Sequence, residues 1–183
     1  MKHIDEKDIV RRLRDGKTRA AAFTELVKAY KEKLYWQIRR MVLSHEDADD
    51  VLQNTFVKVW AGLDAFRGDA KLGTWLYRIA ANETLNFLER NRQANNLSID
   101  DGEGRVALTL QGDPYFDGDE TQRRLQEAIE HLPPKQRQVF LLRYYDEMKY
   151  EDMSRVLDTS VGALKASYHH AVKKISDLLG RQD

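Results

Sequence analysis

The chain of 183 residues contains no cysteine, which excludes disulfide bonds and thiolate metal sites. It also lacks any apolar run near the roughly 20 residues that a membrane-spanning helix needs, so we expect no membrane insertion. The first residues are charged and have no signal-peptide core, which favours a cytoplasmic protein. Hydrophobic residues make up 42% and charged residues 33% of the chain, which is typical of a soluble helical protein with modest cores.

The chain also lacks a surplus of either charge, since its net charge is zero. The charges are nevertheless unevenly distributed along the chain. Residues 1–95 carry 18 basic and 14 acidic side chains. Residues 96–120 carry 1 basic and 7 acidic side chains, and residues 121–183 carry 11 basic and 9 acidic ones. Two weakly basic blocks therefore flank an acidic connector. Phosphate contacts from such weakly basic blocks would not hold duplex DNA tightly. A DNA-binding function would need a partner that contributes affinity.

Proline is scarce, and its few positions help to divide the chain. Pro114 lies in the acidic stretch 96–120, which also has four glycines and little periodicity, and we interpret this stretch as a flexible linker. On both sides of it, apolar residues recur at helical spacing. We therefore predict an all-α protein with two small helical domains, at residues 1–95 and 121–183, joined by the acidic linker at 96–120.

A capped helix with an acidic first turn is predicted in the first half. Ser44 is placed as its N-cap, and its apolar stripe is expected to include Trp60. The carboxylates from Asp47 to Asp50 allow two interpretations, a metal or acid/base site and a docking face. Acidic residues are ordinary in a first turn because they complement the helix dipole, which argues against the catalytic interpretation.

The stretch Phe66–Asn82 combines a polar, glycine-bounded loop with the start of a helix, for which we predict Thr74 as the cap. Trp75, Arg78 and Asn82 are spaced by three and four residues and so share one helix face. An aromatic ring, a cation and an amide suit a single nucleic-acid strand, because they can stack on a base, bind phosphate and read a base edge. The alternative is a half-buried tryptophan beside a solvated polar face.

Helix-turn-helix spacing is predicted in the second half. Pro133 and Pro134 break one helix; a short helix at 150–157, a turn at 158–160 and a long helix to Leu179 follow. On the long helix an inward stripe including Val172 is expected, and the opposite face has small residues first and basic or histidine residues beyond them. This profile favours DNA contact. His169 and His170 point about 100° apart on a helix, so we expect no metal site there.

These motifs together resemble the sigma factors of bacterial RNA polymerase, and most closely their extracytoplasmic-function group. The resemblance extends from about Ala22 to Leu179 and weakens between the two halves. It implies an alternative sigma factor, with no enzymatic activity and no cofactor, that directs transcription initiation, often in a stress response. The implied partners are core polymerase (through the clamp helices of its largest subunit and its flap), promoter DNA and an anti-sigma factor.

The resemblance also implies three sets of site residues. Those expected to bind core polymerase, as in region 2.2 of the family, are Asp47, Asp50, Gln53 and Asn54. Those expected to read the promoter −10 element and to capture the unpaired non-template strand are Arg67, Gly68, Asp69, Lys71, Trp75, Tyr77, Arg78 and Asn82. Those expected to read the −35 element, as in region 4, are Lys165, Ala166, Ser167, His169, His170 and Lys173.

Three other functions are compatible with parts of the sequence. A stand-alone helix-turn-helix regulator would bind DNA tightly without polymerase, which the weak net charge argues against. A helical hydrolase would use the carboxylates from Asp47 to Asp50, but no histidine or metal partner is evident. An anti-sigma or adaptor protein would bind polymerase without needing Asn82 or a helix-turn-helix.

Overall fold

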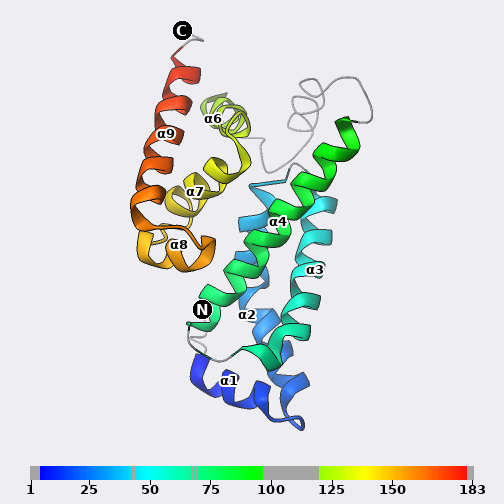
Figure 1. Cartoon of the computed structure of the whole chain (residues 1–183). Coiled ribbons are helices and arrows are strands. Elements are labelled where there is room, and N and C mark those ends of the chain that lie inside the picture. Colours follow the sequence, from blue (N-terminus) through cyan, green and yellow to red (C-terminus); the bar gives the residue numbers. More distant parts are fainter. Residues whose placement is uncertain (1–4, 43, 67, 69, 97–119, 181–183) are drawn as a thin grey trace.

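The computed structural model describes residues 5–42, 44–66, 68, 70–96 and 120–180. All regular secondary structure within these residues is helical, with eight α-helices and one short 3-10 turn, which confirms the predicted all-α class. The helices form two domains, and Figure 1 shows one beside the other. Arg67, Asp69 and residues 97–119 of the predicted linker lie outside the described residues. Among the residues that are described, no helix has both the length and the apolar character needed to cross a membrane.

The first domain packs four helices around a core of large aliphatic side chains. Its elements are α1 (Glu6–Arg14), α2 (Arg19–Arg39), α3 (His45–Gly62), the 3-10 turn η1 (Leu63–Ala65) and α4 (Leu72–Asn96). Leu26, Leu34 and Ile38 of α2, Val59 of α3 and Leu76 of α4 have no exposed surface. Burial of each such side chain contributes roughly 1.5–3 kcal/mol to folding, so this core fixes which faces of α3 and α4 point outward.

Local capping signals were sufficient at one helix start and misleading at another. Ser44 Oγ accepts a hydrogen bond from the Asp47 backbone N–H at 3.0 Å, which confirms the predicted N-cap of α3. The prediction of Thr74 as the cap of the next helix is wrong, because α4 begins at Leu72. There the Leu72 N–H donates to Glu6 Oε2 at 3.3 Å, so a carboxylate from α1 satisfies the start of α4.

The second domain contains the helix-turn-helix. Its elements are α6 (Glu120–Glu130), α7 (Pro134–Tyr144), α8 (Tyr150–Leu157) and α9 (Val161–Leu179). Asp158 ends α8 in the left-handed conformation with φ of 50°, and Ser160 Oγ accepts from the Ala163 N–H at 3.3 Å to begin α9. The short helix, the turn and the long helix confirm the sequence prediction.

Two residues placed on inward stripes by periodicity lie at the surface instead. Trp60 is 45% exposed, because Val59 occupies the buried position and the Trp60 ring only packs edge-on against Phe23 at 4.9 Å. Val172 is 38% exposed, because Ala171 occupies the buried position beside it. In both cases neighbouring apolar residues competed for one inward position, and the pattern did not show which would fill it.

The cap of α3 provides a first testable prediction. The Ser44→Ala variant is expected to lose about 1 kcal/mol of unfolding free energy, because the Asp47 N–H loses its acceptor. Urea unfolding followed by circular dichroism measures this loss. Ser176→Ala, at an exposed position within α9, is the control and should unfold as the wild type does. Equal stability of Ser44→Ala and wild type would show that the cap contributes nothing.

Candidate nucleic-acid interface

The outer face of α9 presents the side chains expected to contact duplex DNA. Leu164, Ala171 and Ile175 are buried on its inner side. The outer face begins with small exposed residues, and the predicted residues follow along it. Of these, only Ser167 is half-buried; the exposed ones are Lys165, Ala166, His169, His170 and Lys173. The structure thus brings all six to one accessible helix, with its N-terminal part free of bulky side chains.

The ring of Tyr150 lies beside the start of this face. Lys165 Nζ lies 5.7 Å from the centroid of the Tyr150 ring, and the Arg143 guanidinium lies 5.3 Å from the same ring. Tyr150 is packed against the core of the helix-turn-helix, so two cations share a fixed aromatic neighbour. The rings of His169 and His170 are 6.1 Å apart. No group of three or more potential metal ligands occurs among the described residues.

The residues expected to read the −10 element lie in different environments. Gly68, Lys71, Arg78 and Asn82 are exposed. Trp75 is half-buried, and its ring lies 4.7 Å from that of Phe66. The tryptophan is therefore partly in the first core, as the alternative interpretation of the motif expected, while the cation and the amide on the same face reach solvent.

Tyr77 lies on a different side of α4 from these residues. Its ring packs against the cluster beneath the helix-turn-helix, and burial raises the pKa of its hydroxyl to about 12. Arg78, next along the chain, has Nη2 3.9 Å from Asp158 Oδ2 in the turn before α9. The second domain thus approaches the helix that carries the predicted −10 residues.

A hollow of about 390 Å³ adjoins the predicted −10 loop, and sequence reasoning did not find it. Arg14, Arg19, Leu63, Asp64 and Phe66 line it. Arg19 Nη2 binds Asp64 Oδ1 at 2.5 Å. The arginines in and just after α1 were the available sequence signal for this hollow. No short-range pattern connects them to a loop some fifty residues further along the chain.

The predicted polymerase-binding residues lie together on α3. Asp50, Gln53 and Asn54 are exposed, and Asp47 is half-buried. Two apolar side chains extend the same face at helical spacing: Val57 is 66% exposed and Trp60 is 45% exposed. Their spacing from Gln53 was a signal that sequence reasoning missed. The result is a mixed polar and apolar face, as expected of a protein-binding surface.

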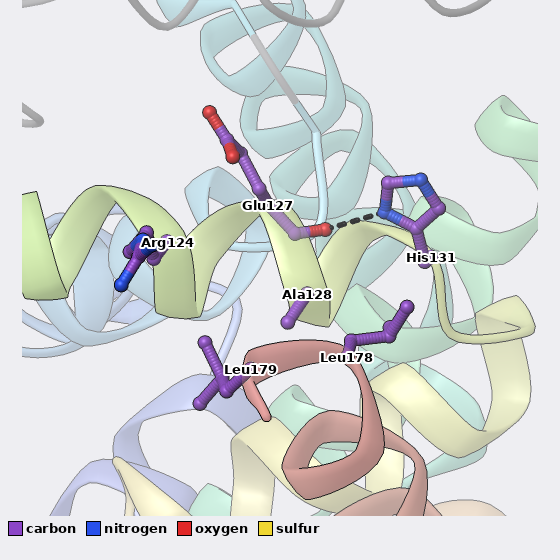
Figure 2. A pocket seen from close by; sticks show the side chains of 6 residues that line it. All are labelled: Arg124, Glu127, Ala128, His131, Leu178 and Leu179. Atoms are coloured by element: carbon purple, nitrogen blue, oxygen red, sulfur yellow. Dashed lines mark hydrogen bonds between the residues drawn. The ribbon is translucent and has the colours of Figure 1, made fainter. Parts of the chain in front are cut away.

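A smaller cavity of about 130 Å³ lies between α6 and the end of α9. Figure 2 shows Ala128 of α6 facing Leu178 and Leu179 of α9, with Arg124 and His131 at its two ends. His131 Nδ1 lies 2.7 Å from the Glu127 carbonyl oxygen, so the imidazole is engaged with its own helix. Small-molecule sites usually occupy about 300–1,000 Å³, so this apolar cavity is small for a substrate.

Comparison with known proteins decides the family. Residues 26–94 match the model of sigma-70 region 2, and residues 122–175 match that of sigma-70 region 4. Over 157 residues the chain is 31% identical to the ECF RNA polymerase sigma factor SigW of Bacillus subtilis, which covers 81% of this chain and 83% of that protein. The chain belongs to the extracytoplasmic-function sigma factors. It therefore binds core RNA polymerase and directs promoter-specific initiation.

Other sigma factors are similar over nearly the whole chain. The RNA polymerase sigma-H factor of Pseudomonas aeruginosa is 32% identical over 182 residues, which cover 95% of this chain and 93% of that protein. Among solved structures, CnrH in complex with the cytosolic domain of CnrY has a TM-score of 0.71 and 25% identity, with 97% and 99% of the two chains covered. The sigma factor RpoE of Bartonella quintana, bound to the anti-sigma factor NepR, shares the fold at a TM-score of 0.68 and 22% identity, with 86% and 96% covered.

Proposed function

We propose that three exposed helix faces of this sigma factor bind three different targets. The face of α3 docks on core polymerase, the start of α4 captures the −10 element, and the outer face of α9 reads the −35 element. Residues 1–95 then carry polymerase binding and promoter opening, and residues 121–183 carry −35 recognition. The observation that carries the proposal is that each predicted set, where described, lies on one helix or, for Gly68 and Lys71, in the loop just before it, with most of its residues exposed.

The outer face of α9 suits the major groove of a −35 duplex. Ala166 and the other small residues at its start let the helix backbone approach the base edges. Lys165 and Lys173 can bind phosphates or base acceptors, and the two histidines add further hydrogen-bonding groups. Because few cations take part, the contact is weak alone and depends on polymerase for affinity.

The exposed side of α4 suits a strand that has left the duplex. Arg78 supplies a cation for phosphate, Asn82 supplies an amide for a base edge, and the accessible part of Trp75 offers a surface for stacking. Flipping a base costs a few kcal/mol of unstacking, which such contacts can offset. Promoter opening by this route needs no catalytic residue of the sigma factor, since the polymerase itself makes RNA.

The face of α3 suits the clamp helices of the largest polymerase subunit. Asp50, Gln53 and Asn54 provide polar contacts, and Val57 and Trp60 provide apolar area beside them. A mixed face of this kind fits a reversible partner. The second domain would contact the polymerase flap.

An anti-sigma factor is the other partner that we propose. This proposal rests on two solved structures of similar proteins. CnrH forms a complex with the cytosolic domain of CnrY, and RpoE forms one with the anti-sigma factor NepR. Cytoplasmic action in a stress response fits this control by a partner. The alternative of a stand-alone helix-turn-helix regulator is not favoured, because the matching family models and the similar proteins are sigma factors.

Asn82→Ala tests strand capture. We expect open-complex formation by the holoenzyme to slow by about tenfold, because a base contact contributes roughly 1–3 kcal/mol. Permanganate footprinting of unpaired thymines measures opening. Asn91→Ala, on the opposite side of α4 and also exposed, is the matched control and should open promoters at the wild-type rate. Wild-type opening by Asn82→Ala would rule out the base contact.

Lys165→Ala tests the −35 contact. Binding of a −35 duplex by the holoenzyme should weaken, and the slope of log K against log salt should fall by about one. Fluorescence anisotropy over a salt series measures both. Lys17→Ala removes an exposed lysine of the first domain and should change neither quantity. An unchanged slope in Lys165→Ala would mean that this lysine does not meet phosphate.

Asp50→Arg tests docking through α3. The affinity for core polymerase should fall by at least about tenfold, because a like-charge contact at an interface costs several kcal/mol. Competition against labelled wild-type chain measures the affinity. Glu32→Arg makes the same charge change at an exposed position of α2 and should bind normally. If both variants bind equally well, core polymerase docks elsewhere.

A further inference from the structure

Two segments without a predicted role in promoter binding contact the loop between η1 and α4. α1 and the first residues of α2 lie before residue 26, where the match to sigma-70 region 2 begins, and none of the predicted site residues lies in them. Ile9 and Leu13 bury one side of α1 in the first core. Figure 1 shows α1 across the end of this domain where α3 ends and α4 begins.

Glu6 of α1 holds the end of this loop. Its Oε2 accepts a hydrogen bond from the Leu72 N–H at 3.3 Å, and its Oε1 accepts one from the Tyr30 hydroxyl at 2.8 Å. Leu72 is the buried first residue of α4 and Tyr30 belongs to α2, so one carboxylate joins three helices. A carboxylate also suits a helix start, where unpaired N–H groups carry partial positive charge. Glu6 therefore fixes the point at which α4 begins.

Tyr30 in turn fixes the Glu6 side chain. Burial, and then the hydrogen bond to Glu6, raise the pKa of the Tyr30 hydroxyl above its ordinary value, so the hydroxyl stays protonated and remains a donor. Gly73 fits closely against the same pair, because a Cβ at this position would lie 3.3 Å from the Tyr30 hydroxyl oxygen and 3.7 Å from Glu6 Oε1. The first turn of α4 therefore has little room to shift toward α1 and α2.

Arginines hold the other parts of the loop. Arg19 Nη2 pairs with Asp64 Oδ1 of η1 at 2.5 Å, and Arg19 Nε donates to the Leu13 carbonyl oxygen at 2.9 Å, which ties η1 to the end of α1. The Arg14 guanidinium reaches the loop at Gly68, where a Cβ would lie 3.6 Å from Nη2. Gly68 has φ of 82°, a conformation that favours glycine. The beginning, a middle position and the end of the loop are thus each in contact with α1 or α2.

The Glu6 contacts lie beside the side chains that are proposed to read the −10 element. Lys71 directly precedes Leu72, and Trp75 follows within the first turn of α4. Loss of the Glu6 carboxylate would leave the Leu72 N–H without its acceptor, and the first turn of α4 would fray. Because hydrogen bonds to a base need donor–acceptor distances of about 2.7–3.2 Å, a shift of about 1 Å in the reading side chains removes discrimination between bases.

We propose that Glu6 and Tyr30 are positioning residues for −10 reading, which hold the loop and the start of α4 in the geometry that distinguishes one base from another. The proposal rests on −10 reading by this part of the chain, as proposed above. Both residues act through the Leu72 N–H and not by contact with DNA. Their loss lowers selectivity among −10 sequences and leaves core-polymerase binding intact, since the proposed docking face on α3 shares none of these contacts.

Glu6→Ala tests this role in the holoenzyme. One promoter fragment is transcribed by the wild-type holoenzyme, a second has a single −10 base pair changed so that it opens more slowly, and permanganate footprinting gives both opening rates. The ratio of the two rates should fall by at least about fivefold, because one base contact discriminates by about that factor or more. A variant that is only less stable would slow opening on both fragments alike. An unchanged ratio would therefore overturn the proposal.

Two milder variants separate the hydrogen bonds from the bulk of the side chains. Glu6→Gln keeps an oxygen that can accept from the Leu72 N–H and an amide that can donate to the Tyr30 hydroxyl, so the ratio should stay near the wild-type value. Tyr30→Phe removes only the hydroxyl and should lower the ratio less than Glu6→Ala does. Glu32→Ala, at an exposed position of α2, is the matched control and should leave the ratio unchanged. Equal losses in Glu6→Gln and Glu6→Ala would contradict a role through these hydrogen bonds.

Folding and assembly are measured on the same variants. Circular dichroism should show wild-type helicity, and competition against labelled wild-type chain should show wild-type affinity for core polymerase. If Glu6→Ala does not fold, Tyr30→Phe decides the question, because its ring still packs against the first core. A wild-type ratio in Tyr30→Phe would then overturn the proposal. Loss of core affinity in step with loss of opening would contradict it too, since the residues would support the domain as a whole.

The failure of this inference is distinguishable from that of the proposed function. If Asn82→Ala slows promoter opening but Glu6→Ala and Tyr30→Phe keep the full ratio, strand capture by α4 stands and the positioning role is wrong. If Asn82→Ala opens promoters at the wild-type rate and the ratio is also unchanged in Glu6→Ala, this part of the chain does not read the −10 element, and both proposals are wrong.

Discussion

The packing of α4 is the constraint on which the other surfaces depend. Leu76 and Ala80 are fully buried in the core of the first domain, and this fixes the rotation of the helix. Since successive helical residues turn by about 100°, the neighbouring positions Tyr77 and Ala81 must then face the second domain. Asn82 comes next and reaches solvent. One buried stripe therefore decides which side chains are left for a nucleic acid.

This arrangement gives a physical reason for the proposed separation of tasks between helices. The proposed docking face of α3 shares no described residue with the contact between the domains, so binding to polymerase and contact between the domains need not exclude one another. The proposed −10 surface of α4 borders that contact, since Tyr77 and Ala81 pack against the second domain while Arg78 and Asn82 reach solvent. The outer face of α9 points away from the core of its own domain, with Leu164 and Ile175 buried behind it.

Sequence reasoning succeeded where short-range signals fix the structure. The limits of α8 and α9 followed from a turn of three residues, and Ser44 was a correct N-cap because its partner is three residues away. It failed where distant segments decide. The start of α4 depends on Glu6, and the outward position of Trp60 depends on how α3 packs. The same limit applied to the candidate site, since helical spacing grouped Trp75 with Asn82 but could not show that Phe66 covers part of the ring.

The most direct test of the central claim is transcription from a pool of host promoter fragments by matched core polymerase, with and without this chain. A sigma factor that reads both elements yields new transcripts, and their start sites share one −35 and −10 pair at constant spacing. The absence of new transcripts, with core binding intact, would contradict promoter reading by the chain and point to an adaptor. The absence of both would favour a stand-alone DNA-binding protein.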